Sequence, residues 1–399
     1  MSAEERVMTD LKIFGEHDER TVAQMWRCMG VGSVAGGVLC ADGHLGYAQP
    51  VGGVIAYEEH VSISGVGFDI GCGNMAAQLN LKYEDIRERV PMIANDIAKE
   101  VSFGLGRSNP KPIDHELFDS PLWDDAGVGH LKQMARAQLG TVGSGNHYVD
   151  LFEDEDGYVW IGVHFGSRGL GHKSATHFIK QAGGKDGIDV APTIVHDKSE
   201  LGTRYLAAMT LAGQYAYAGR EWVVERVRRI LCARTTDTVH NHHNYAWREN
   251  HAGRDLWVVR KGATPAFPGQ RGFVGGSMAD DAVILRGIES DAAANSLYST
   301  VHGAGRVMSR SEARGRSVKD PATGKRIRQQ GRVRHDEMQA WLRGKGVHLI
   351  GGDLDEAPQA YRRLPDVLAH HDGTVEIEHQ LRPFIVLMAG ADVFDPFKD

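Results

Sequence analysis

Residues 64–74 read "SGVGFDIGCGN" and place one aspartate and one cysteine among four glycines. Glycine lets the backbone bend sharply and approach an ion or a phosphate group without a Cβ in the way. The side chains of Asp69 and Cys72 could then point at the same cation, and a thiolate can bridge two cations. A pair of metal ions suits in-line displacement at phosphorus, because one ion stabilises the attacking oxygen and the other the leaving oxygen. The stretch therefore predicts a metal-binding turn.

The composition of the 399-residue chain is that of a globular protein, with 42% hydrophobic and 24% charged residues. Its formal net charge of −7 argues against a protein coated in positive charge but allows a local basic groove. The first residues, MSAEERVMTD, lack the pattern of a signal peptide, and no apolar run approaches the roughly 18 residues of a membrane span. We therefore expect a cytoplasmic protein without membrane contacts, in which the widely spaced cysteines are reduced thiols: Cys28, Cys40, Cys72 and Cys232.

The chain mixes the periodicities of helices and strands. Apolar residues at helical spacing predict helices over residues 85–101 and 203–231. Short β-type runs predict strands over residues 51–57, 157–164 and 383–388. These elements indicate a fold that contains both helices and sheets.

Four further stretches combine histidine with glycine, serine or asparagine. Singly, each could be structural, because glycine clusters usually mark turns and most histidines are hydrogen-bonded structural residues. Together with Asp69 and Cys72 they supply a carboxylate, a thiolate and imidazoles, which are the ordinary metal ligands in proteins. Loops of this kind let side chains converge on a ligand. The stretches are "GSGNH" (143–147), followed by Asp150, "HFGSRGLGH" (164–172), "HNHHN" (240–244) and "HGAGR" (302–306).

Residues 305–334 form a basic segment, with ten lysines and arginines against Glu312 and Asp320. A run of charges is usually a solvated surface loop. The alternative is a phosphate-binding surface. The excess of cations in an otherwise acidic chain favours the second interpretation modestly.

Eight motifs, in order, resemble those of the RtcB family of RNA ligases, from about residue 41 to about residue 390. Members of this family join an RNA 3′-phosphate or 2′,3′-cyclic phosphate to an RNA 5′-hydroxyl, with GTP and Mn²⁺. The resemblance implies an α+β fold in one compact catalytic domain (residues 1–390), with the motifs in one cleft and a C-terminal extension (391–399). The motifs are "ADGHLGYAQPVGGVIA" (41–56), "GVGFDIGCGN" (65–74), "GSGNHYVDL" (143–151), "HFGSRGLGH" (164–172), "HHNY" (242–245), "KGATPAFPG" (261–269), "HGAGRVMSR" (302–310) and "DEAPQAY" (355–361).

The resemblance implies a role for each of these positions. His302 would be the nucleophile that takes GMP from GTP, in a surface loop that contributes little to the core. Two Mn²⁺ ions would be held, with Cys72 touching both, by Asp69, Cys72, His147, His164 and His243. The nucleotide site would consist of Asn146, Asp150, His243, Asn244, Ser277, Gly303, Ala304, Gly305, Arg306 and Tyr361. The RNA would be contacted by Arg168, Arg306 and Arg310.

The chemistry of these residues is compatible with that reaction. A neutral imidazole can attack the α-phosphorus of a nucleotide, and the phosphoramidate that forms can pass GMP onward. Arg306 and Arg310 could neutralise phosphate oxygens through two parallel hydrogen bonds each. Ligand softness alone would favour Zn²⁺ or Co²⁺ at a thiolate with three imidazoles, so the expectation of Mn²⁺ comes from the family.

The chain departs from the family at two positions of the nucleotide site. Asp150 replaces a glutamate that contacts guanine in many relatives, and Met388 stands where relatives carry a lysine that reaches this base. Methionine cannot donate to guanine O6, which predicts weaker selectivity for GTP over ATP. Alternatively, the extension folds back over the nucleotide through Phe394 and Phe397, and Lys398 replaces the lysine. We favour the first interpretation, because nothing in the spacing requires the extension to return.

Two other function classes use the same residues. A metal-dependent phosphoesterase would act on RNA 3′ ends without sealing them and would not need His302. An RNA-end-binding protein would retain a decayed site. Within the ligase class, tRNA splicing, RNA repair, action on DNA ends and help from an accessory activating protein all remain open from the sequence.

Overall fold

Strand β5 (Gly73–Lys82) follows directly on the predicted metal-binding turn and lies inside the largest sheet that the described residues form. The structure is a computed structural model that describes residues 11–319, 323–324 and 326–391. The larger sheet has the strand order β13-β14-β19-β6-β7-β5-β9, and β18 pairs with β19. The other strands of this sheet are β6 (Tyr148–Glu153), β7 (Tyr158–Phe165), β9 (Thr235–His242), β13 (Arg271–Val274), β14 (Ala282–Gly287), β18 (His348–Gly352) and β19 (Val375–Gly390).

The second sheet has the order β1-β2-β3-β11-β10. Because β9 ends at His242 and β10 begins at Asn244, the chain passes from one sheet to the other at a single residue, His243. The strands of the second sheet are β1 (Leu11–Ile13), β2 (Val34–His44), β3 (Val51–Tyr57), β10 (Asn244–His251) and β11 (Arg254–Lys261). Three small pairs complete the strands: β4 (His60–Ser62) with β8 (Ile194–His196), β12 (Ala263–Pro265) with β15 (Ser299–Val301), and β16 (Ser317–Lys319) with β17 (Arg326–Arg328).

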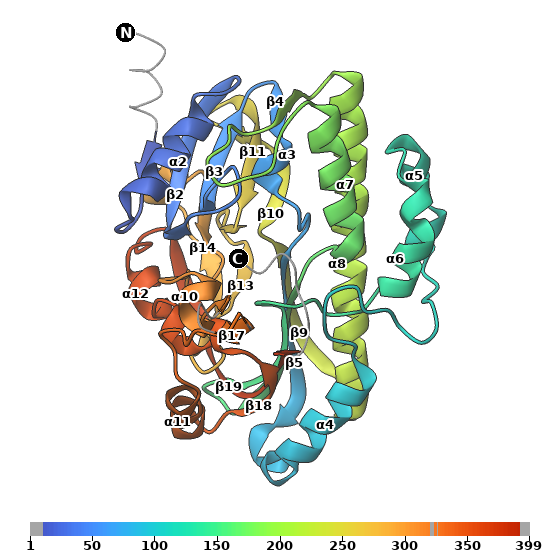
Figure 1. The fold of residues 1–399 in the computed structure, drawn as a ribbon, viewed down its shortest axis with the longest axis vertical. Coiled ribbons are helices and arrows are strands. Elements are labelled where there is room, and N and C mark those ends of the chain that lie inside the picture. The colour runs from blue at the N-terminus through green and yellow to red at the C-terminus, as the bar shows by residue number, and fades with distance from the viewer. Residues whose placement is uncertain (1–10, 320–322, 325, 392–399) are drawn as a thin grey trace.

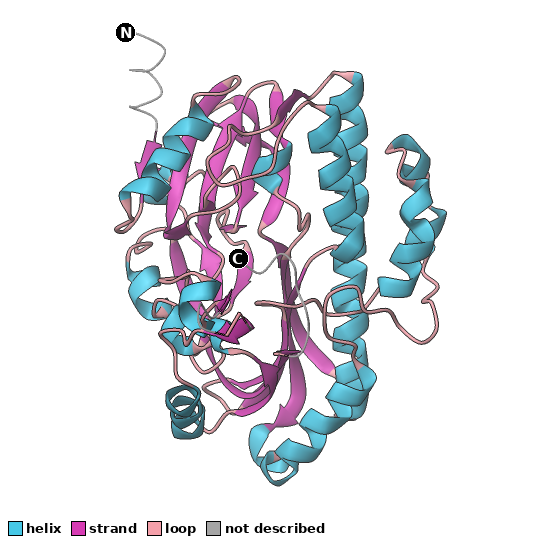
Figure 2. Ribbon diagram, in the orientation of Figure 1, coloured by secondary structure: helices cyan, strands magenta, loops and turns pink. Residues whose placement is uncertain are grey.

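Helix α8 (Glu200–Ile230) runs along the long axis of the molecule, beside α7 (Arg168–Gln181), and the two cover one side of the sheets (Figure 1). The Ser199 side chain caps α8 by accepting from the Gly202 amide, and Arg228 and Arg229 occupy its last turn, where cations stabilise the helix dipole. Figure 2 shows the shorter helices distributed around the molecule, some beside the sheets and some on the outer side of the α7–α8 pair. They are α2 (Glu19–Met29), α3 (Ile63–Val66), α4 (Val90–Glu100), α5 (Leu122–Asp125), α6 (Lys132–Gln138), α9 (Asp291–Asn295), α10 (Arg310–Arg314), α11 (His335–Lys345) and α12 (Leu364–Ala369).

The core is formed where α8 packs on other elements. Tyr205 and Tyr215 of α8 are buried in one hydrophobic cluster with Phe178 of α7. Val223 of α8 is buried in a second cluster with Ile161 of β7 and other strand residues of the larger sheet. A fully buried valine, isoleucine or phenylalanine side chain contributes about 1.5–3 kcal/mol, so these contacts stabilise the packing of α8 on the larger sheet and on α7.

The structure confirms the α+β fold in a single domain. The predicted strands correspond to β3, to β7 and to part of β19, and the predicted helix over 203–231 corresponds to α8. The helix predicted over 85–101 begins only at Val90, after two short 3₁₀ turns, Tyr83–Asp85 and Arg87–Arg89. Pro91 explains the shorter helix, because proline lacks the amide hydrogen that a preceding helical turn would require. No helix among the described residues combines the length and apolar composition needed to cross a membrane.

The basic segment is partly ordered. It contributes α10 and the two-stranded ribbon of β16 and β17, and Arg314 pairs with Asp353 at 3.6 Å. The segment is therefore more than a solvated loop over the part that the structure describes. The C-terminal residues 392–399, with Phe394, Phe397 and Lys398, lie outside the described residues, so the two interpretations of the extension both stay predictions.

The position of Gly73 gives a test of the fold. A Cβ at this glycine would lie 2.1 Å from the carbonyl oxygen of Asn241, which belongs to the backbone of β9 and cannot move without breaking the ladder. We expect Gly73→Ala to lower the free energy of unfolding by about 1–3 kcal/mol, measured by chemical denaturation. Gly344→Ala, in α11 with open space around the new Cβ, should be neutral or stabilising. Equal stability of the two variants would contradict the register of β5 and β9.

Candidate active site

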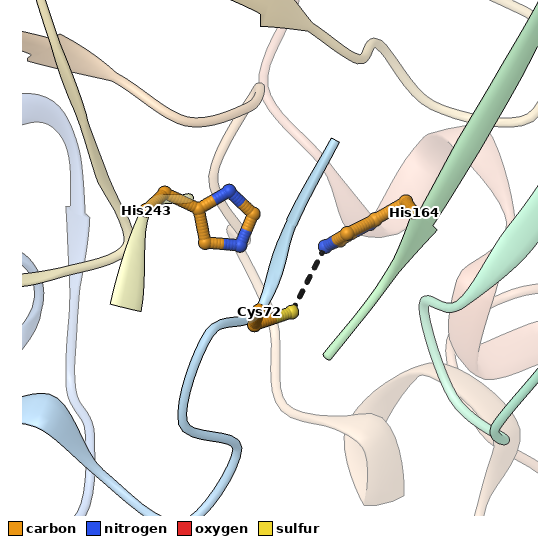
Figure 3. A group of neighbouring side chains, drawn as sticks. All are labelled: Cys72, His164 and His243. Atoms are coloured by element: carbon orange, nitrogen blue, oxygen red, sulfur yellow. Dashed lines mark hydrogen bonds between the residues drawn. The ribbon is translucent and has the colours of Figure 1, made fainter. Parts of the chain in front are cut away.

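Three adjacent strands bring the predicted metal ligands together. In the antiparallel ladders, Gly73 of β5 faces Phe165 of β7 on one side and His242 of β9 on the other. Cys72 directly precedes β5, His164 is the next-to-last residue of β7, and His243 directly follows β9. Figure 3 shows these three side chains from three neighbouring segments gathered around the sulfur of Cys72.

Cys72 is common to two groups of potential ligands. Its Sγ lies 3.3 Å from Nε2 of His164 and 3.7 Å from Nε2 of His147. His147 Nε2 in turn lies 3.0 Å from Oδ2 of Asp69. The ligand atoms of Cys72, His164 and His243 all lie within 4.8 Å of one another, and so do those of Asp69, Cys72 and His147. The structure therefore brings all five predicted ligands together, as two groups that share Cys72.

The backbone conformation of the turn explains why glycines surround Asp69 and Cys72. Gly67 and Gly71 have φ angles of +88° and +71°, in the left-handed region that side chains with a Cβ rarely adopt. The turn closes through a hydrogen bond from the Cys72 amide to the Asp69 carbonyl (3.0 Å). The Cys72 carbonyl then accepts from the amide of His243 (2.8 Å), which fixes the crossing between the sheets next to the cysteine.

A buried arginine behind the turn holds it in place. Nη1 of Arg220, on α8, donates to the carbonyl oxygens of Gly71 (3.0 Å) and Phe165 (2.6 Å). Burial lowers the pKa of Arg220 to about 10, which still leaves the guanidinium charged at neutral pH. Arg220 thus ties the turn to the end of β7 and places a positive charge near Cys72, where a thiolate would form.

The protonation states suit cation binding. Burial lowers the pKa of His164 and of His243 well below the usual value, so both imidazoles are neutral. Burial would raise the pKa of Asp69, but the hydrogen bond from His147 and the nearby charges lower it, so the carboxylate stays ionised. Burial and the neighbouring Asp69 raise the pKa of the Cys72 thiol well above the usual value, and a bound cation would favour the thiolate.

The donor set therefore fits a metal centre. Within the described residues, Nδ1 of His147 and Nδ1 of His243 are buried without a hydrogen-bond partner, which leaves polar atoms at the centre unsatisfied. A carboxylate, a thiol and three imidazoles, most of them buried, fit two cations that share Cys72.

His302 reaches this centre through a second strand pair. Ala263 of β12 faces Val301 of β15, and the Ala263 amide donates to the carbonyl oxygen of His243 (3.2 Å). As a result, the rings of His302 and His243 lie 4.9 Å apart between centroids. The predicted nucleophile is thus a direct neighbour of a predicted metal ligand.

Asp42 orients His302, a contact that sequence reasoning missed. Its Oδ2 lies 2.6 Å from Nδ1 of His302 and also accepts from the backbone amides of His302 (3.0 Å) and Gly303 (3.3 Å). Burial opposes ionisation of Asp42, but the charge and hydrogen bonds of His302 lower its pKa, so the carboxylate is ionised. Because an ionised carboxylate can only accept, Nδ1 carries the proton, and in the neutral form of the ring the lone pair therefore lies on Nε2.

The expectation that His302 lies in a surface loop needs correction. Its side chain is only 13% exposed and is bonded to a carboxylate that is fully buried. Replacing His302 would leave the charge of Asp42 buried with backbone donors alone, which costs stability. Asp42 lies inside the motif at 41–56, and its place in a glycine-rich run is the one signal that could have marked it.

A cavity of about 1150 Å³ opens over the metal ligands and His302. The predicted nucleotide residues all line it: Asn146, Asp150, His243, Asn244, Ser277, Gly303, Ala304, Gly305, Arg306 and Tyr361. The side chains of Asn244 and Ser277 also shape its walls, because Asn244 accepts from the Gly262 amide (2.7 Å) and Ser277 donates to Asp280 (2.6 Å). The sequence-predicted motifs therefore converge on one cavity.

One wall of the cavity carries the two positions that depart from the family. Met388 faces Tyr148 and Val386 faces Asp150 across the ladder of β19 and β6. Burial raises the pKa of the Asp150 carboxyl group well above its usual value, which favours its neutral form. Oδ1 of Asp150 is buried and has no hydrogen-bond partner within the described residues, so it could accept from a ligand.

The arginines predicted to contact RNA occupy different surroundings. Arg306 and Arg310 line the cavity, but both are paired with acidic residues of the "DEAPQAY" segment. Arg168 is absent from the cavity lining formed by the described residues. Its Nη2 donates to the carbonyl of Gly104 (3.2 Å), and its charge helps to lower the pKa of Asp69.

Comparison with known proteins finds one family over nearly the whole chain. A family model described as tRNA-splicing ligase RtcB matches residues 24–389. The chain is 31% identical over 378 residues to the RNA-splicing ligase RtcB of Escherichia coli (strain K12), covering 86% of this chain and 88% of that protein. It is 31% identical over 431 residues to the tRNA-splicing ligase RtcB of Thermococcus kodakarensis, covering 87% and 86%. It is 29% identical over 430 residues to the RNA-splicing ligase RtcB of Mycobacterium tuberculosis, covering 86% and 94%.

The shared position of Cys72 predicts different metal losses in two variants. Cys72→Ala should lose most of both ions, because a bridging ligand serves both sites, whereas His243→Ala should retain about one ion per chain. The measurement is metal content per folded chain by atomic emission after dialysis against Mn²⁺. Equal metal content in the wild type and Cys72→Ala would exclude the bridging role.

Proposed function

The chain belongs to the RtcB family, and from this we propose that it is an RNA ligase that joins RNA 3′-phosphate or 2′,3′-cyclic phosphate ends to 5′-hydroxyl ends. We propose GTP as the co-substrate and two Mn²⁺ ions as the cofactors. The observation that carries the proposal is the position of His302, oriented by Asp42 and adjacent to His243 in the same cavity. Both tRNA splicing and RNA repair would use this reaction.

The first step is a nucleotidyl transfer to the protein. Nε2 of His302 attacks the α-phosphorus of GTP, a P–N bond forms, and pyrophosphate leaves. Asp42 keeps the proton on Nδ1 before the attack and balances the positive charge of the ring afterwards. A buried carboxylate performs this task well, because the charge pair is shielded from solvent.

The next two steps transfer the activation to RNA. An oxygen of the RNA 3′-phosphate attacks the phosphorus on His302, the P–N bond breaks, and an RNA-ppG end results. A 5′-hydroxyl then attacks the 3′ phosphorus of that end, loses its proton, and expels GMP as the phosphodiester forms. A 2′,3′-cyclic phosphate must first be opened by water to the 3′-phosphate.

The metal ligands follow from the donor set. Asp69, Cys72, His147, His164 and His243 would hold the ions, with Cys72 in both groups. When bound, the ions would stabilise the negative charge that develops on phosphoryl oxygens. The neutral imidazoles of His164 and His243 are ready to coordinate without first losing a proton.

A phosphoesterase or an RNA-end-binding protein remains the alternative function. Such a protein could use the same metal ligands and the same cavity. It would have no use for an imidazole whose Nδ1 is held by a buried carboxylate and whose ring lies beside that of His243, a predicted metal ligand. The Asp42–His302 pair therefore favours the ligase, and a covalent adduct with GMP separates the two classes.

The nucleophile is tested by labelling the protein with α-labelled GTP and Mn²⁺, followed by a denaturing gel. We expect an adduct with the wild type and none with His302→Ala. Asp42→Asn should slow adduct formation by at least about tenfold, because the amide can stabilise the wrong tautomer of His302. Circular dichroism melting checks that both variants are folded. A labelled band that persists in His302→Ala would reject this nucleophile.

The base selectivity is tested by competition of ATP against GTP in the same assay. Met388 offers no donor to guanine O6, so ATP should compete measurably with the wild type and less well with Met388→Lys. Truncation after Gly390 should change little. Strict GTP selectivity that is lost on truncation would instead place Lys398 in the site.

A further inference from the structure

Glu356 contacts three polar side chains of the cavity at once. It ends the 3₁₀ turn Leu354–Glu356 and is 3% exposed. Its Oε2 accepts from Nη1 of Arg306 (3.4 Å) and from the hydroxyl of Tyr361. Its Oε1 accepts from Nη1 of Arg310.

The neighbouring Asp355 completes the array. Its backbone carbonyl accepts from Nη2 of Arg306 (2.6 Å), and its Oδ2 accepts from Nη1 of Arg310 (3.1 Å). Asp355 is fully buried. Two guanidinium groups thus face two buried carboxylates, and the four charges cancel.

Most hydrogen-bond donors of the Arg306 guanidinium are already used within the protein. A guanidinium has five N–H donors. In Arg306, Nε donates to the Met308 carbonyl (3.2 Å), Nη1 to Glu356 and to the Tyr361 hydroxyl (2.8 Å), and Nη2 to the Asp355 carbonyl. Four of its five donors are therefore engaged by the protein. This arginine cannot hold a phosphate through two hydrogen bonds without breaking internal ones.

Arg310 is held differently. Its hydrogen bonds to the described residues all use Nη1, toward Asp355 and Glu356. Nη2 lies beside Gly145, where a Cβ would come within 2.9 Å, and Gly145 belongs to the loop that carries His147. The edge formed by Nε and Nη2 is the edge of the guanidinium that these bonds leave for a ligand, and it can bind two phosphate oxygens side by side.

We propose that Glu356 is a positioning residue that holds Nη1 of Arg310, so that the opposite edge of the guanidinium meets a phosphate group, and that fixes Arg306 and Tyr361 as a rigid wall behind it. The proposal rests on the proposed function, because the phosphate is that of GTP or of an RNA end. Since the array carries no net charge, it recognises phosphate by pre-oriented donors rather than by excess positive charge.

The simplest competing role for Glu356 is that of a counter-ion. A counter-ion would weaken phosphate binding, so Glu356→Gln would bind phosphate more tightly and Glu356→Asp, which keeps the charge, would behave like the wild type. If Glu356 is a positioning residue, Glu356→Asp should instead weaken phosphate binding. Aspartate is one methylene shorter and withdraws the carboxylate from Arg310, although the net charge is unchanged.

The test titrates inorganic pyrophosphate into the Mn²⁺-loaded protein by calorimetry. We expect Glu356→Asp to weaken pyrophosphate binding by roughly tenfold and to slow formation of the GMP adduct by roughly 10–100-fold, as a misplaced contact does. Arg310→Lys should weaken pyrophosphate binding on its own. Adding Glu356→Asp to Arg310→Lys should weaken it little further, because lysine lacks the planar pair of donors that Glu356 would orient. Pyrophosphate affinity unchanged in Glu356→Asp, or tighter binding in Glu356→Gln alone, would overturn the proposal.

Glu378→Gln is the matched control. Glu378 also bridges two arginines, Arg271 (2.6 Å) and Arg286, but lies on β19 and is absent from the described lining of the cavity. We expect it to lower the melting temperature while leaving pyrophosphate affinity and the adduct rate unchanged. A wild type that binds pyrophosphate but forms no adduct would reject the proposed function, while the affinities would still decide the role of Glu356.

Discussion

The pairing of β5 with β7 on one side and β9 on the other is the constraint on which the site depends. Gly73 fits there because its missing Cβ leaves room for the Asn241 carbonyl. This register places the ends of the three strands next to one another. The predicted ligands at those ends are therefore close together as soon as the sheet has formed. Arg220 reinforces the arrangement from behind by bonding to the carbonyls of Gly71 and Phe165. The proposed metal centre would therefore be positioned by the sheet rather than by a long loop.

Carboxylates orient the working groups of the cavity, and two of them, Asp42 and Glu356, are buried. Asp42 fixes the ring of His302, Asp69 contacts His147, and Glu356 holds Arg310. Burying a carboxylate is costly unless it is fully hydrogen-bonded, so Asp42 and Glu356 tolerate few positions for their partners. Because burial of the carboxylate is costly without its hydrogen bonds, the side chains that make those bonds are held in fixed positions. An array prepared in advance need not reorganise when charge develops on a phosphoryl group.

The sequence predicted the local features and missed the pairs that only the tertiary structure creates. Periodicity located β3, β7 and α8, because these elements bury continuous apolar faces. The resemblance to the family located the residues that line the cavity. Asp42 was missed because 260 positions separate it from His302. The engagement of the Arg306 donors was equally invisible, because a guanidinium motif does not reveal which acids face it.

The chain passes between the two sheets at His243. The proposed metal centre would therefore also act as a link between the sheets. His243 is the only residue between β9 and β10, and its backbone is bonded to Cys72 and to Ala263. Cations held there would fasten the two sheets to each other at their junction. Because a ligand that binds only the folded state adds its binding free energy to stability, such ions would act as a reversible cross-link. The ions would thereby stabilise the fold by cross-linking it, as disulfide bonds do in many secreted proteins, but through metal–ligand bonds that form with a reduced cysteine.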